Sequence, residues 1–185
     1  MKEKLNKYLD QVQIASHVAI ISVLGLIPKI DLPFLPGVPI TAQTLGVMLS
    51  GTLLSYRNSI YSVGIFLMLV LIGAPLLSGG RGGISVFFAP SAGYLFGWII
   101  GAGTISIIFA VLKNHLKIYL ASVFACFIGG IITIHACGII GLVLITELNF
   151  LQASYLTLAF IPGDIIKCFL AAFITSKLNH KFSTD

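Results

Sequence analysis

Charged residues are scarce in this sequence. Only 9% of its 185 residues are charged and 57% are hydrophobic, whereas a soluble domain has about 25% charged and roughly 45–50% apolar residues. Three long stretches carry no charge at all: Arg57 to Arg81, Arg81 to Lys113, and Lys117 to Glu147. Each exceeds the roughly 20 apolar residues that cross a hydrocarbon core. The deficit excludes a soluble domain and predicts an all-α membrane protein.

The chain also lacks the sequence motifs that nucleotide hydrolysis and metal binding require. Its segment LLSGGRGG, residues 76–83, contains LSGG, which resembles the signature motif of ABC-type ATPases. No Gly-Lys pair occurs, however, so the chain has no phosphate-binding P-loop. Cysteines and histidines are not clustered at ligand spacing, since His135 and Cys137 diverge by about 200° on a helix. We therefore expect no enzyme activity, no metal site and no cofactor.

The hydrophobic pattern predicts one integral membrane domain, residues 1–185, with six membrane-spanning helices. The N-terminal segment shows no cleavable signal, so residues 1–12 are expected to be a cytoplasmic lead-in and residues 177–185 a cytoplasmic tail. The predicted spans are residues 13–27, 40–54, 59–76, 91–112, 118–146 and 153–176.

The distribution of basic residues predicts the orientation in the membrane. Six spans place both termini on one side, and eight lysines and arginines fall on that side: Lys2, Lys4, Lys7, Arg57, Lys113, Lys117, Lys177 and Lys181. Only Lys29 and Arg81 fall in the opposite loops. The positive-inside rule therefore predicts cytoplasmic termini in a prokaryotic cell membrane. The formal charge of +5 is scattered, so no nucleic-acid partner is expected.

The segment IPGDIIK, residues 161–167, carries the most informative polar residues. Asp164 and Lys167 are the only charges between Glu147 and Lys177. Placing a charge inside a span costs about 2.5–3.5 kcal/mol on insertion scales. Their spacing of three residues puts both on one helix face. A purely structural ion pair is the alternative, but intramembrane charges favour a functional site.

The glycine-rich loop around Arg81 is the second candidate region. Four glycines surround this arginine, and an apolar continuation with Phe87, Phe88 and Tyr94 follows. This continuation favours a re-entrant segment that caps a cavity between the third and fourth spans over a flexible linker. Arg81, Lys167 and Asp164 together carry one positive charge, which suits a small ligand with one carboxylate.

Other polar residues are weaker candidates. Thr41 and Gln43 open the second span near the same outer surface. His17 and His135 are typical of packed or hydrogen-bonded core histidines rather than of proton relays.

Two seams of small residues predict close helix contacts. Gly93, Gly97 and Gly101 lie four residues apart, and this ladder favours packing inside the bundle. Ala15 and Ala19 form a similar seam on the first span.

Four motifs in order give the chain a resemblance to a known family. The segments VPITAQTLGVMLSG, GAPLLSGGRGG, APSAGYLFG and IPGDIIK resemble those of BioY-type proteins, the substrate-binding components of energy-coupling factor (ECF) biotin transporters. The resemblance covers almost the whole chain. It implies six membrane helices, a pocket for biotin that opens to the outside, and a separate energising module of one transmembrane coupling protein and two ATPases.

The resemblance also implies roles for individual residues. Asp164 would accept hydrogen bonds from the ureido N–H groups of biotin, and Lys167 and Arg81 are both candidates for its carboxylate. Ser78 would lie near the ureido ring, and Tyr94 would belong to the apolar wall. Ala15 and Ala19 match the AxxxA seam through which such components dock on their membrane partner, so this match favours a docking role for the alanines.

Two other classes of protein remain as alternatives. One is a self-sufficient, ion-coupled secondary transporter of a small carboxylate, with Asp164 as the proton site, although no convincing internal repeat is visible. The other is an intramembrane aspartyl protease, but that chemistry requires two aspartates that share a proton, and Asp164 is the only aspartate in a span.

Overall fold

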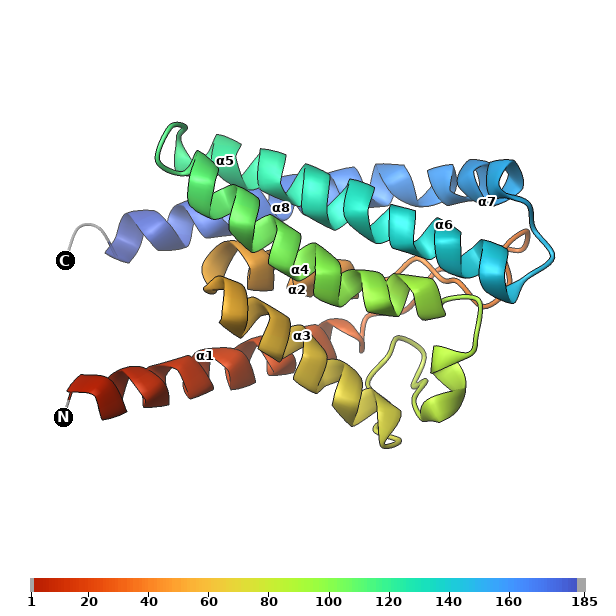
Figure 1. Ribbon diagram of the computed structural model, residues 1–185, viewed down its shortest axis with the longest axis horizontal. Coiled ribbons are helices and arrows are strands. Elements are labelled where there is room, and N and C mark those ends of the chain that lie inside the picture. The colour runs from red at the N-terminus through yellow and green to blue at the C-terminus, as the bar shows by residue number, and fades with distance from the viewer. Residues whose placement is uncertain (1, 183–185) are drawn as a thin grey trace.

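The computed structural model describes residues 2–182 and folds them into a helical bundle (Figure 1). The elements are α1 (Lys2–Leu24), α2 (Gln43–Leu53), α3 (Tyr56–Leu71), η1 (Ile84–Phe87), α4 (Ala92–Leu112), α5 (Ile118–Ala125), η2 (Cys126–Thr133), α6 (Ile134–Ile145), α7 (Phe150–Thr157), η3 (Leu158–Phe160) and α8 (Ile161–Phe182). Because α5, η2 and α6 follow one another without a break, as do α7, η3 and α8, the described chain contains six main helical segments, the number predicted.

Both ends of the described chain lie at one end of the bundle, on the left in Figure 1, together with the α2–α3 and α4–α5 turns. The long first loop, η1 and the α6–α7 connection lie at the opposite end. This arrangement fits an even number of crossings. Which end faces the cytoplasm stays a prediction, and the last three residues of the predicted tail lie outside the described residues.

The helices differ in how far they can reach across a membrane. In the described chain, residues 92–112, 118–145 and 150–179 form helices that are long and apolar enough to span it. Helix α2 has only 11 residues and rises about 16 Å, roughly half of a hydrocarbon core. The predicted span 40–54 is therefore longer than the helix observed. Its first residue, Ile40, is extended and pairs with Ile30 in an isolated bridge, and the helix begins only at Gln43.

The third span also ends earlier than the predicted residue 76. Helix α3 ends at Leu71, and Gly73 follows with a φ of 107°, a left-handed conformation that glycine adopts readily and that ends helices. Residues 72–91 then form a bent segment, named the outer segment after the predicted orientation, that contains η1 and a bridge between Leu77 and Arg81. The re-entrant character of this segment stays a prediction.

Helix α4 lies at the centre of the bundle and packs against α2, α3, α5, η2 and α6. A Cβ added at Gly93 would lie 2.7 Å from the Gly141 Cα of α6, and one at Gly101 would lie 2.8 Å from the Gly129 carbonyl of η2. Such distances are too short for real side chains, so these glycines permit close helix packing. The prediction that the ladder packs inside the bundle is confirmed.

Candidate ligand-binding site

A cavity lies below the first loop and the outer segment, between α2, α4, α6 and α8. Its wall combines apolar side chains with most of the predicted polar site residues. Its lining residues are Val38, Pro39, Ile40, Thr41, Gln43, Thr44, Leu77, Arg81, Ser91, Tyr94, Leu95, Trp98, Ile134, His135, Phe160, Asp164 and Lys167. The cavity volume is about 50 Å³, which is room for a few water molecules because one water requires about 10–15 Å³.

Asp164 lies where the last crossing changes its helical form. The 3₁₀ turn η3 ends at Phe160, and α8 begins at Ile161 with Pro162 as its second residue. Proline is tolerated in a first helical turn because no backbone N–H is needed there. Asp164 therefore lies in the first turn of α8. Its side chain is 7% exposed.

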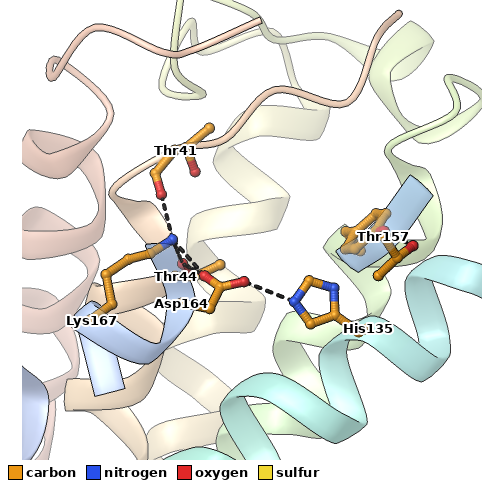
Figure 2. Close-up of polar contacts among 7 residues, drawn as sticks. Thr41, Thr44, His135, Thr157, Asp164 and Lys167 are labelled. Atoms are coloured by element: carbon orange, nitrogen blue, oxygen red, sulfur yellow. Dashed lines mark hydrogen bonds and ion pairs between the residues drawn. The ribbon is translucent and has the colours of Figure 1, made fainter. Parts of the chain in front are cut away.

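Lys167 is held by three oxygen atoms, as Figure 2 shows. Its ammonium group lies 2.6 Å from Asp164 Oδ1, and it donates to the Thr41 carbonyl at 2.8 Å and to Thr44 Oγ1 at 2.7 Å. An ammonium group has three donors, so these contacts use all of them. The predicted shared face of Asp164 and Lys167 is confirmed.

Two further residues complete this cluster and were not predicted as site residues. Thr44 donates to Asp164 Oδ1 at 3.3 Å. His135 Nε2 lies 2.8 Å from Asp164 Oδ2, on the side of the carboxylate opposite Lys167 (Figure 2). His135 is thus a hydrogen-bonded buried histidine, as expected, but its partner is the predicted site residue Asp164.

Arg81 reaches the cavity from the outer segment and makes only long contacts. Its Nη1 donates to the Gly37 carbonyl at 3.4 Å and lies 3.5 Å from Ser91 Oγ. Its Nε is buried and has no hydrogen-bond partner among residues 2–182. Burial lowers the pKa of this guanidinium, and the nearby Asp31 carboxylate opposes that effect. Arginine stays charged in proteins, so Arg81 is a cation with unused donors.

Gln43 lines the cavity, but its amide group holds the outer segment in place. Its Nε2 donates to the Ile21 carbonyl of α1 at 3.2 Å and to the Leu76 carbonyl at 3.0 Å. Its Oε1 accepts from the Ser78 N–H at 3.0 Å and from Ser78 Oγ at 3.3 Å. Gln43 and Ser78 are both fully buried. Gln43 therefore connects α1, α2 and the glycine-rich loop, and Ser78 lies behind it rather than in the cavity wall.

Tyr94 lines the cavity from α4. Its hydroxyl lies 3.0 Å from Thr157 Oγ1, and its ring packs edge-on against His135 with 5.7 Å between ring centroids. Gly138 of α6 leaves space for this ring, because a Cβ there would collide with it. The structure thus brings five of the six predicted site residues, all except Ser78, to one cavity.

These features define a class: a polytopic membrane protein with a small cavity below its loops, lined by buried charges from α8 and by a loop arginine. The BioY family model matches residues 1–184 of the chain, and the chain belongs to the BioY family.

Individual relatives are similar over nearly their whole length. The chain is 46% identical over 169 residues to the biotin transporter BioY of Rhizobium etli, which covers 89% of this chain and 90% of the relative. It is 41% identical to the probable biotin transporter BioY of Bacillus subtilis, with 96% and 94% covered. The fold matches the crystal structure of the S-component for biotin from an ECF-type ABC transporter with a TM-score of 0.89, at 33% identity over 95% of this chain and 93% of that one.

Proposed function

We propose that this protein is the substrate-binding component of a biotin uptake transporter. It binds biotin from the outside and delivers it inward together with an ATP-driven energising module. Membership of the BioY family supports this function, as does the likeness to the biotin S-component. The observation that carries the proposal is the cluster of Asp164, Lys167 and His135 in a cavity that Arg81 also lines.

The chemistry of biotin matches the two ends of this cavity. The ureido N–H groups are donors that suit the Asp164 carboxylate, which still has acceptor capacity on Oδ2. The carboxylate of the ligand suits Arg81, because Lys167 has no free donor while it holds Thr41, Thr44 and Asp164. The apolar rings and alkyl chain then lie against side chains such as Trp98, Leu95 and Tyr94.

Binding requires the outer segment to move. A bicyclic ligand is several times larger than a cavity of about 50 Å³. Residues 72–91 contain four glycines with positive φ, namely Gly73, Gly79, Gly80 and Gly83, and such backbone changes conformation easily. The segment opens to admit biotin and closes over it, and closure strengthens the charged contacts by excluding water.

Ala15 and Ala19 provide the proposed docking seam for the membrane partner. Both lie on the exposed face of α1, and Ala15 borders a shallow apolar groove with Ile14, Val18 and Ile65. Small residues at this spacing allow another helix to approach closely. Release of biotin to the cytoplasm then depends on the coupling protein and its ATPases, not on this chain alone.

Equilibrium binding of labelled biotin to the detergent-solubilised protein tests the binding step. We expect saturable, tight binding by the chain alone, and its absence would overturn the proposal. Proteoliposomes that contain only this chain should not accumulate biotin when a pH gradient is applied. Accumulation under those conditions would instead support an ion-coupled transporter.

The docking seam is tested by substitutions on the same helix. Ala15→Trp and Ala19→Trp should abolish biotin uptake in cells that contain the energising module and leave biotin binding intact. Ile20→Trp is the matched control, because Ile20 is exposed but is rotated by about 100° from Ala19. Equal loss of uptake in all three variants would contradict a docking seam.

A further inference from the structure

The hydroxyl group of Ser91 differs from the other buried serine hydroxyls of residues 2–182. Six other buried serines each donate their hydroxyl proton to an acceptor at 2.8 to 3.3 Å: Ser50, Ser59, Ser62, Ser78, Ser106 and Ser122. Ser91 is 5% exposed, and its one side-chain contact in that part of the chain is with a donor, Arg81. A buried donor without an acceptor has lost its hydrogen bond to water and gained none in return, so this hydroxyl requires an explanation.

Ser91 does not use its side chain to cap the helix that follows. It is the N-cap residue of α4, a position where a serine oxygen commonly accepts from a backbone N–H of the first turn. The backbone of Ser91 is instead helical, with φ −79° and ψ −5°, and its side chain makes no capping hydrogen bond. The Tyr94 N–H bonds to the Ser91 carbonyl oxygen at 3.1 Å. Helix capping therefore does not explain the hydroxyl.

Arg81 determines how the Ser91 hydroxyl can be used. Its Nη1 lies 3.5 Å from Ser91 Oγ, and a guanidinium group has only donors, so the serine oxygen is the acceptor in this contact. The hydroxyl proton is then available to another group. Both residues line the cavity, and Arg81 also has a buried Nε without a partner in the described chain. Two neighbouring side chains in this part of the wall thus have unused donors.

The acidic side chain that acts on Arg81 does not serve these donors. Asp31 is close enough to influence the charge of Arg81, but its carboxylate accepts from Lys29 Nζ at 2.8 Å. No hydrogen bond joins Asp31 to Arg81 or to Ser91 among the described residues. A carboxylate from a ligand has about four lone-pair sites, so it can accept from both side chains at once, and hydrogen bonds of this charged kind are the stronger class.

We propose that Ser91 is a ligand-binding residue that donates its hydroxyl proton to the carboxylate of the ligand, next to Arg81. This inference rests on the proposed function, since it assigns a second contact to the carboxylate of the same ligand. A cation alone attracts any anion, whereas a guanidinium and a hydroxyl 3.5 Å apart require an acceptor with several lone pairs at one place. The pair therefore selects ligands that end in a carboxylate over ligands of equal length that end in an apolar group, because such a group leaves both donors buried without partners.

The test compares Ser91→Ala with the unmodified protein for two ligands. One is biotin, and the other is its analogue in which a methyl group replaces the carboxylate, so that it accepts no hydrogen bond at that end. Calorimetry measures the Kd of the solubilised protein for each. We expect Ser91→Ala to bind biotin about tenfold more weakly, as the loss of one hydrogen bond to a charged group predicts, and to bind the methyl analogue with an unchanged Kd.

Two results would overturn the inference. An unchanged Kd for biotin in Ser91→Ala would mean that the hydroxyl does not contact the ligand. Equal losses for biotin and for the methyl analogue would mean that the hydroxyl acts on the shape of the cavity and not on the carboxylate. Either result leaves biotin binding by the unmodified protein established. Failure of the unmodified protein to bind biotin would instead overturn the proposed function itself.

Ser106→Ala is the matched control. Ser106 also belongs to α4 and is also 5% exposed, but its hydroxyl donates to the Leu54 carbonyl at 3.2 Å and it does not line the cavity. Its substitution should lower the unfolding temperature and leave both Kd values unchanged. Ser91→Ala should leave the unfolding temperature of the ligand-free protein nearly unchanged, because no internal acceptor loses its donor. A loss of biotin affinity in Ser106→Ala as large as that in Ser91→Ala would show that removal of any buried hydroxyl weakens binding, and the inference would fail.

Discussion

The two cations that line the cavity have opposite surroundings. Lys167 on α8 contacts three oxygen atoms at 2.6 to 2.8 Å, whereas Arg81 on the outer segment makes contacts of 3.4 and 3.5 Å and has a buried Nε without a partner in the described chain. The α8 side of the cavity is thus fixed before a ligand arrives. The side formed by the outer segment still has hydrogen-bonding capacity that a ligand can use.

This contrast indicates a division of tasks. The buried ion pair on α8 costs desolvation energy that is recovered only because each partner is well hydrogen-bonded, and it holds the Asp164 carboxylate in one orientation. The arginine lies in a segment with several positive-φ glycines and can move with it. We infer that recognition of the ligand head group belongs to the fixed side, and that capture of a carboxylate belongs to the mobile side.

Asp164→Asn should have the largest effect. The change removes the negative charge that balances Lys167 and replaces an acceptor with an amide that also carries donors. We expect biotin affinity to fall by about 100-fold or more, because a charged hydrogen bond is lost and a buried cation is left unpaired. Calorimetry measures this change, and circular dichroism verifies that the helices remain. Unaltered affinity in a folded variant would show that the fixed side does not bind the ligand.

Lys167→Met should cause the second-largest loss of biotin affinity. This loss should arise mainly because Asp164 loses its ion-pair partner. Breaking a buried ion pair by removing one partner costs about 3–5 kcal/mol, so we expect a lower unfolding temperature as well as weaker binding. The losses should be equal for biotin and for biotin amide, in which the carboxylate is neutral. A larger loss for biotin than for its amide would mean that Lys167 contacts the ligand carboxylate directly.

Arg81→Gln should weaken biotin binding less than the two α8 variants do, and it should weaken the binding of biotin more than that of biotin amide. Because Arg81 makes only long contacts within the protein, its substitution should leave the unfolding temperature nearly unchanged. Biotin affinity should fall by about 10- to 100-fold, the range for a hydrogen bond to a charged group, whereas binding of biotin amide should hardly change. Equal weakening of both ligands would remove Arg81 from carboxylate capture and reduce the contrast between the two cations.

The sequence predicts the Asp164–Lys167 pair on α8 better than it predicts the residues that contact this pair from other helices. The pairing of Asp164 with Lys167 follows from a spacing of three residues on one helix, which is local information. The position of His135 depends on η2, a stretch of π-helix over Cys126–Thr133 that changes the residues per turn just before it. No sequence pattern revealed that stretch, so an α-helical wheel cannot show that His135 faces Asp164.

The outer segment shows the same limit. The glycines and the apolar continuation predict a segment that caps a cavity, and Arg81 does line the cavity. That Gln43 holds this loop through Leu76 and Ser78 could not be predicted, because the contacts join residues 33 and 35 positions apart. Thr44 was missed for a similar reason: it lies 120 residues from Asp164 in the chain, although its neighbours Thr41 and Gln43 were already candidates.

Gln43→Leu should change biotin affinity least among these variants, because the amide of Gln43 is already used within the protein. The change leaves the Leu76 carbonyl and the Ser78 N–H without their partner, at about 1–3 kcal/mol for each buried group. We expect a lower unfolding temperature. We also expect faster association and faster dissociation of biotin, measured by stopped-flow fluorescence, with a change in Kd of only a few-fold.

Ser78→Ala distinguishes a positioning role of that residue from direct contact with the ligand. It removes one hydroxyl contact of 3.3 Å and keeps the N–H bond to Gln43, so a residue that only positions the loop should give a smaller kinetic change than Gln43→Leu. A contact between the Ser78 hydroxyl and the ureido ring, as the family resemblance implies, predicts instead a loss of affinity that exceeds that of Gln43→Leu. In that case the outer segment contributes to head-group recognition, and the division between a fixed and a mobile side of the cavity does not hold.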